Sequence, residues 1–322
     1  MAHKFINTET IIGRVYQHDL VIKKVQNENS ANYGKDFISG KLDIAVDEDG
    51  LNVISVNYTY VSPTYSSGKE NTTYKALKKI IDNGKTWVVD GKENATMVRA
   101  TPSLALNDFD TERDGETVHV AAKKNEGGFL SIINSLPEEH DETGYSQRSK
   151  FTTDILITKV KRVEADEERN IPEYVNIHGA VFDFRGSILP VDLVAKTDNA
   201  MNYFESLEPT SKEPVFTKVW GTIDCTVIER KITEESAFGE AAVRTIRTGR
   251  KEWVVTGAAK VPYDFGDEEV LNAEQVKTKM QDREVYLAEQ KKNREEWIAK
   301  RNAENGKPKN SGVTVSTDDF DF

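Results

Sequence analysis

The chain has 322 residues, of which 37% are hydrophobic and 30% are charged, and its formal net charge is -11. Its length suggests two domains, and no stretch approaches the roughly 18 apolar residues that a membrane helix requires. The N-terminus shows no secretory pattern. Because Cys225 is the only cysteine, an intramolecular disulfide is excluded, and we expect a protein of the reducing cytoplasm.

Residues 1–122 are predicted to form a first β-barrel. Alternating apolar side chains indicate strands at 10–25, 37–46, 51–61, 95–107 and 116–122. Apolar residues at helical spacing predict a helix over 70–83, between the third and the fourth strand. Three strands, one helix and two strands follow the order of an OB-fold, a five-stranded Greek-key barrel.

Residues 151–266 repeat this order without repeating the sequence. Strands are predicted at 151–163, 174–184, 187–195, 215–231 and 241–256, with a helix at 198–207. The predicted fold class is therefore mainly β, with two OB-fold-like five-stranded Greek-key barrels. An all-β sandwich with short helices is the alternative.

Three further segments complete the predicted domain organisation. Residues 123–150 are polar and are expected to connect the barrels. Residues 267–304 contain neither glycine nor proline and predict a long charged helix, solvated for most of its length, with a coiled coil as the alternative. Residues 305–322 are polar, and we expect a disordered tail with an acidic tip.

Motifs of catalysis and of metal binding are missing from the sequence. Residues 84–86 (GKT) resemble the end of a phosphate-binding loop, but Lys79 stands where its first glycine belongs. Residues 110–115 resemble the start of a calcium-binding loop, but Ala121 stands where the closing glutamate belongs. We therefore predict a protein that is not an enzyme and has no catalytic residues, metal site or cofactor.

Several aromatic and cationic side chains fall on outward positions of the predicted strands. Proteins that bind single-stranded nucleic acid stack bases on aromatic rings and contact phosphates through Lys and Arg. The candidate nucleic-acid-binding residues are Arg14, Tyr16, His18, Phe37, Lys41, Tyr58, Tyr60, Arg99, Lys218 and Trp220. Tyr58 and Tyr60 share the parity of the apolar Ile54 and Val56, so a core position is an equal alternative for both. Because no segment is basic, a cationic groove requires that charges are sorted between faces.

The chain ends in an acidic peptide that contains two phenylalanines. Its residues are Asp318, Asp319, Phe320, Asp321 and Phe322. A flexible acidic strand with a terminal aromatic ring and a free carboxylate suits a basic, hydrophobic pocket on a partner protein. A tail that only increases solubility is the alternative.

Three segments carry a resemblance to a known family: the tip DDFDF, the opening residues 12–15 (IGRV), and residues 34–44 followed by DEDGLNV. In these segments the chain resembles the single-stranded DNA-binding proteins of bacteria and, more closely, of tailed bacteriophages. The resemblance implies a protein that coats and protects single-stranded DNA, with RNA as a possible ligand, during replication or recombination. It also implies a cytoplasmic location, that of the host if a phage encodes the protein, and recruitment of replication or recombination proteins through the tip.

Two barrels and a long helix depart from the usual plan of that family, so the resemblance leaves homo-oligomer formation open. The alternative function is that of a virion structural or assembly protein, whose barrels contact other protein subunits.

Overall fold

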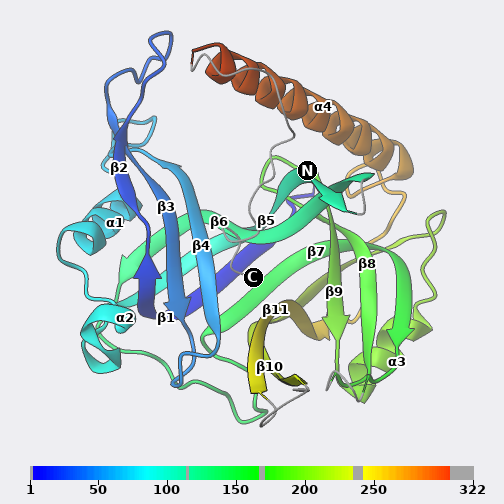
Figure 1. Ribbon diagram of the computed structural model, residues 1–322. Helices are drawn as coiled ribbons and strands as arrows, with labels where there is room; N and C mark the ends of the chain where they lie inside the picture. Colours follow the sequence, from blue (N-terminus) through cyan, green and yellow to red (C-terminus); the bar gives the residue numbers. More distant parts are fainter. Residues whose placement is uncertain (1–2, 114–115, 167–170, 235–241, 305–322) are drawn as a thin grey trace.

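The strands of the first barrel close in the order of an OB-fold. A computed structural model describes residues 3–113, 116–166, 171–234 and 242–304 (Figure 1). The strands are β1 (Asn7–His18), β3 (Asp36–Ala45), β4 (Val53–Val61), β5 (Met97–Arg113) and β6 (Glu116–Ile132). β1 pairs antiparallel with β3 and β5, β3 with β4, and β5 with β6. A parallel pairing of β4 with β6 closes the barrel, and the short β2 (Val21–Lys24) extends β3 at its outer edge.

The second barrel has the same topology. Its elements are β7 (Ser149–Val163), β8 (Tyr174–Phe182), β9 (Ile188–Ala195), α3 (Asp198–Ser206), β10 (Val215–Glu234) and β11 (Ala242–Ala258). β7, β8 and β9 form an antiparallel meander, β10 pairs with β7 and β11, and β9 meets β11 in parallel. The prediction of two OB-fold-like barrels is therefore confirmed.

One continuous sheet joins the two barrels. The first half of β1 pairs antiparallel with β7, from Asn7 opposite Thr153 to Ile11 opposite Ser149. All strands consequently belong to one 11-stranded sheet, and Figure 1 shows the barrels side by side on either side of this pairing. The sequence analysis did not predict this junction.

Short helices cover the first barrel at one end. They are α1 (Thr72–Asn83), α2 (Trp87–Asp90) and the 3-10 helix η1 (Lys92–Asn94). α1 begins where the Asn71 side chain accepts hydrogen bonds from the backbone N–H groups of Thr73 and Tyr74, which is a standard helix N-cap. Its Leu77 and Ile80 are buried against the barrel. The predicted helix is confirmed.

The long helix α4 (Ala273–Glu304) confirms the helix predicted at 267–304, although it begins later. It is attached near its N-terminal end. Lys279 Nζ donates to the carbonyl of Gly186, 2.6 Å away, and Arg283 contacts Asp108 of β5 at 2.5 Å. None of the helices described is long and apolar enough to cross a membrane. The predicted tail, including all five residues of its tip, lies outside the described residues.

The hairpin of β5 and β6 is longer than predicted. β6 extends to Ile132 and so occupies the first part of the segment expected to connect the barrels. Its polar residues are held by tertiary contacts: Asn125 is fully buried, and its amide donates to the Ser55 carbonyl at 2.8 Å. Lys123 reaches the second barrel, where its ammonium lies 4.9 Å from the centre of the Trp253 ring.

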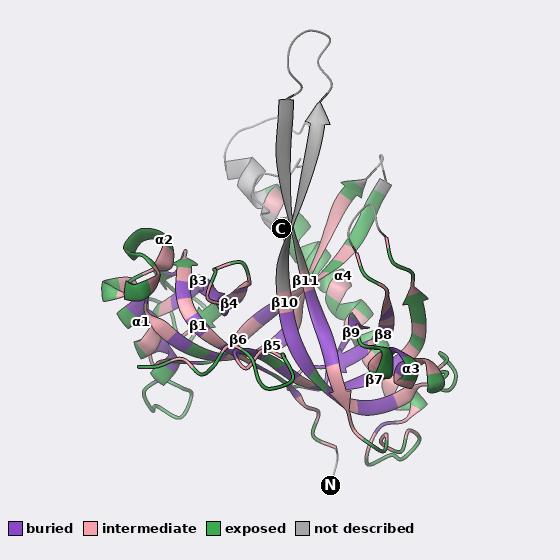
Figure 2. Ribbon diagram, turned by 90° about the horizontal axis from the view of Figure 1, so that it is seen from below, coloured by how far each residue is buried: buried purple, intermediate pink, exposed green. Residues whose placement is uncertain are grey.

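A buried carboxyl group lies at the junction of the barrels. Glu9 of β1 is 2% exposed, and its Oε1 accepts a hydrogen bond from Trp253 Nε1 at 3.0 Å. Its Oε2 has no hydrogen-bond partner among the described residues. Burial raises the pKa of Glu9 to about 8. Figure 2 shows that buried residues lie along the strands of both barrels, whereas helices and loops are mostly exposed.

Gly13 of β1 fills a position where the chain has no room for a side chain. A Cβ there would collide with the Ala45 carbonyl and lie 2.8 Å from Ile44 Cγ2. Because a backbone carbonyl in a closed barrel cannot move aside, Gly13→Ala is expected to lower the free energy of unfolding by about 3 kcal/mol, the upper end of the usual cost of overpacking. Chemical denaturation measures this, with Thr8→Ala on the same strand as the control. A loss below about 1 kcal/mol would contradict the packing described.

Candidate nucleic-acid interface

A cation and two aromatic rings lie in a row across β2, β3 and β4. Phe37 and Tyr60 are in contact, with ring centres 4.8 Å apart and ring planes at 31°. Lys23 of β2 is the cross-strand partner of Phe37, so the two side chains share a face of the sheet. Tyr60 is 46% exposed. Proteins that bind single strands combine aromatic rings and cations in this way.

A groove of about 840 Å³ lies next to this row, and Tyr60 belongs to both. Lys24 and Lys35 line it from the side of the loop between β2 and β3, and Tyr65 lines it from the loop after β4. Tyr33, in the first of these loops, is 54% exposed. We call this surface the β2–β4 groove. The name covers the groove and the row beside it: Lys24, Lys35, Tyr60 and Tyr65 line the groove, Lys23 and Phe37 belong to the row, and Tyr33 and Lys69 are chain neighbours of lining residues.

Positive charge exceeds negative charge in the β2–β4 groove, although the whole chain is acidic. All four of its lysines are exposed, and none forms an ion pair with a described carboxylate. Glu70 is close by, but it pairs with Lys75 at 2.5 Å. Asp36 is the only acidic residue among those that line the groove. The charges of the described residues are thus sorted between faces, as a nucleic-acid site on this chain requires.

Of the ten predicted residues, only Tyr60 lines this groove, and Phe37 contacts the Tyr60 ring from the row beside it. The prediction that Tyr58 binds nucleic acid is wrong. Tyr58 is 2% exposed and belongs to the core of the first barrel, so it cannot contact a base. Strand alternation places Tyr58 and Tyr60 on one face, but the pairing of β3 with β4 shifts register between Ile38 and Gly40. Beyond this shift Val61, and not Tyr60, packs against the core. Lys41 lies beside Asp43, with Nζ 3.4 Å from Oδ2.

A second group of predicted residues lies along β1 and is half-buried. It consists of Arg14, Tyr16 and His18. The Tyr16 ring lies 6.1 Å from that of Trp87. Arg14 Nε and His18 Nδ1 are buried without a hydrogen-bond partner among the described residues. Burial lowers the pKa of His18. No described contact joins this group to the β2–β4 groove.

A third group, Arg99, Lys218 and Trp220, lies on outward positions of β5 and β10. Arg99 is exposed, and Lys218 is half-buried. Trp220 is 40% exposed, and its indole lies so close over Gly257 that a Cβ there would collide with the ring. One side of this ring is therefore packed on backbone while the other is accessible.

Sequence reasoning missed the loop residues of the β2–β4 groove. The signal was present as a repeated pattern: Tyr33-Gly34-Lys35 recurs as Tyr65 with Gly68-Lys69. Strand alternation cannot relate two loops, and only the closed barrel shows that they form opposite walls of one groove. Among the described residues, no group of three or more His, Cys, Asp or Glu side chains is arranged to hold a metal ion.

Comparison with known proteins gives one family match. The model of the YorF family matches residues 10–293. No curated protein matches the chain. Among solved structures, the wild-type single-stranded DNA binding protein from Thermus aquaticus is similar with a TM-score of 0.44 and 9% identity, over 81% of this chain and 96% of that chain. A deletion mutant of that protein is similar with a TM-score of 0.43 and 10% identity, over 82% of this chain and 98% of that chain.

Proposed function

The chain belongs to the YorF family, and we propose that it is a non-enzymatic protein that binds single-stranded DNA through the β2–β4 groove. The observation that carries this proposal is the row of Lys23, Phe37 and Tyr60, with exposed lysines beside it that form no ion pair with a described carboxylate. β3 and β4 are the second and third strands of their barrel, and this is the face with which OB-folds bind oligonucleotides.

Binding of this kind depends little on sequence. Every base has a face that can stack on Phe37 or Tyr60, and each stacked base contributes on the order of 1–3 kcal/mol. The lysines neutralise phosphates and release counterions, so affinity falls as salt rises. The protein would coat and protect single strands during replication or recombination. RNA offers the same stacking faces and phosphates, so the affinity for single-stranded RNA should be measured beside that for single-stranded DNA.

The acidic tip at residues 318–322 is proposed to recruit replication or recombination proteins. Its support is the sequence: three aspartates and two phenylalanines form a peptide that suits a basic, apolar pocket. The test is binding of a synthetic peptide of residues 312–322 to candidate polymerases, primases and helicases, with both phenylalanines replaced by alanine as the control.

The salt dependence of binding tests the function and the groove together. Titration of a fluorescent oligo-dT is expected to show tight binding at low salt. The double variant Lys24→Ala/Lys35→Ala should reduce the slope of log K against log salt by about 1.4, since each phosphate contact on a single strand contributes roughly 0.7. Lys161→Ala, an exposed lysine of β7, is the matched control. Absence of binding at low salt, also after deletion of residues 316–322, would refute the proposal.

A structural role in a virion is the second candidate, and an exposed apolar patch on the first barrel favours it. Leu51, Val88 and Val89 are 60%, 57% and 82% exposed. Such residues suit a contact with another protein subunit. Light scattering of Val88→Asp/Val89→Asp distinguishes the two functions. A loss of assemblies, together with no DNA binding by the parent protein, would favour the structural role.

A further inference from the structure

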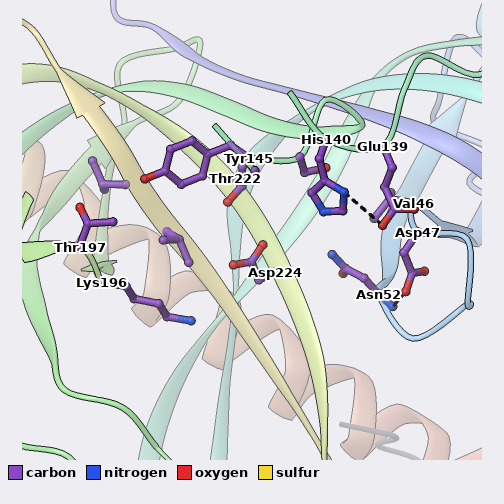
Figure 3. Close-up of a pocket in the computed structure, with 14 residues that line it drawn as sticks. Val46, Asp47, Asn52, Glu139, His140, Tyr145, Lys196, Thr197, Thr222 and Asp224 are labelled. Atoms are coloured by element: carbon purple, nitrogen blue, oxygen red, sulfur yellow. Dashed lines mark hydrogen bonds and ion pairs between the residues drawn. The ribbon is translucent and has the colours of Figure 1, made fainter. Parts of the chain in front are cut away.

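A second cavity, of about 320 Å³, lies at the turn between β3 and β4, whereas the β2–β4 groove lies at the other end of these two strands. Its walls come from the turn between β3 and β4, from the connector between the barrels, from the end of β9 and from β10. The residues used below are Asp47, Tyr145, Lys196, Thr222 and Asp224. Figure 3 shows the Asp224 side chain in the middle of this space, with the Tyr145 ring at its upper edge.

The cavity presents carboxylate oxygens as hydrogen-bond acceptors, and one of them, on Asp47, lacks a donor among the described residues. Asp47 Oδ2 accepts from the backbone N–H groups of Leu51 and Asn52 at 2.9 Å, but its Oδ1 is buried and has no hydrogen-bond partner among the described residues. Asp224 is half-buried, and this burial raises its pKa, whereas the charge of Lys196 and the hydrogen bond from Thr222 act in the opposite direction. The nearby Lys196 directs its ammonium to Glu252, 2.7 Å away. The unpartnered oxygen of Asp47, together with the carboxylate of Asp224, therefore favours a ligand that brings an N–H donor over one that presents only acceptors.

The cavity lies next to an exposed aromatic ring. Trp220, Thr222 and Asp224 alternate along β10, so their side chains share one face. Consecutive positions on that face are about 6.6 Å apart along the strand. Trp220 has one accessible ring face, and Thr222 is buried at the cavity wall. A nucleotide stacked on Trp220 would place its neighbour at the mouth of the cavity.

We propose that this cavity binds one unstacked base of a single strand and selects bases with an exocyclic amino group over thymine. The inference rests on the proposed function. Carboxylate oxygens accept hydrogen bonds from such amino groups, as they do from N4 of cytosine. The carbonyl oxygens of thymine would instead face the carboxylates of Asp47 and Asp224. The Tyr145 ring provides an apolar surface for the base.

Fluorescence anisotropy of the full chain with oligo-dC and oligo-dT of equal length tests the selectivity. The parent protein is expected to bind oligo-dC about tenfold more tightly, the lower range for one good base contact. Asp224→Ala should remove this difference by weakening oligo-dC binding. Binding of oligo-dT should stay equal or become tighter, because a negative charge near the phosphates is lost. Glu142→Ala, an exposed acid of the connector, is the matched control.

The outcomes separate the two proposals. Equal affinity of the parent protein for both oligonucleotides would overturn the base cavity and leave single-strand binding standing. An equal loss for both in Asp224→Ala would also overturn it, because that result indicates a structural role of Asp224. If neither oligonucleotide binds at low salt, both proposals fall. A circular dichroism melt of Asp224→Ala establishes that the variant is folded.

Discussion

Replacing both Phe37 and Tyr60 by alanine is expected to weaken oligo-dT binding by about 100-fold. Each ring that stacks a base contributes on the order of 1–3 kcal/mol, and 1.4 kcal/mol corresponds to a factor of ten. The slope of log K against log salt should stay unchanged, because the two substitutions remove no charge. Anisotropy titration at several salt concentrations measures both quantities.

The single variants add information because the two rings are in contact, with centres 4.8 Å apart. We expect their effects to be non-additive in a double-mutant cycle. Phe184→Ala is the matched control, since Phe184 is 87% exposed and lies in the second barrel. Unchanged affinity of the double variant, with an unchanged melting temperature, would refute the choice of groove while leaving single-strand binding possible elsewhere.

The second large effect concerns stability and pH. The pKa of Glu9 is raised from 4.5 to about 8 in the folded protein. The contribution of the neutral Glu9 side chain to the free energy of unfolding is therefore fully present below pH 4.5. It is lost as the pH rises through 8, because the folded protein then has to bury a charged carboxylate. Linkage sets its size at about 5 kcal/mol, since each pH unit of the shift is worth about 1.4 kcal/mol. Chemical denaturation across this range should show the free energy of unfolding falling with pH.

Glu9→Gln should flatten this dependence. The amide stays neutral at all pH values, and its oxygen can still accept the hydrogen bond from Trp253. The variant should therefore be similar in stability to the parent near pH 5 and several kcal/mol more stable above pH 8. Glu142→Gln, at an exposed site, is the control. A parent protein and a Glu9→Gln variant with the same pH dependence would contradict the buried, unpaired carboxylate.

Local patterns were sufficient to predict the barrels but not their junction. Alternation along β7, β8 and β9 identifies strands because one face of each packs in a core, as Ile155, Ile177 and Leu193 do. The same alternation does not show which edges meet. β1 pairs with β7 across more than a hundred residues, and the Thr- and Glu-containing start of β1 gives no local sign of that partner.

Tertiary contacts also explain the misread segments. Lys123 and Asn125 look like loop residues, yet the ring of Trp253 and the backbone of β4 hold them in a strand. The outward position of Trp220 was predicted correctly, because β10 keeps its alternation there. Tyr58 was placed wrongly, because a register shift decides which tyrosine of β4 leaves the core. Alternation along a strand shows which residues share a face. Whether that face is exposed depends on register shifts and on contacts with residues far away in the sequence.

Under the proposed function, the pairing of β1 with β7 would also determine how much single-stranded DNA one molecule occupies. Barrels tethered by a flexible linker can engage a strand one at a time, and such proteins change their occluded length with salt or protein density. In this protein, five residue pairs between β1 and β7 hold the two barrels in one sheet. The spacing between Phe37 on one barrel and Trp220 on the other is thereby fixed. Each molecule should occlude the same number of nucleotides at every salt concentration at which it binds.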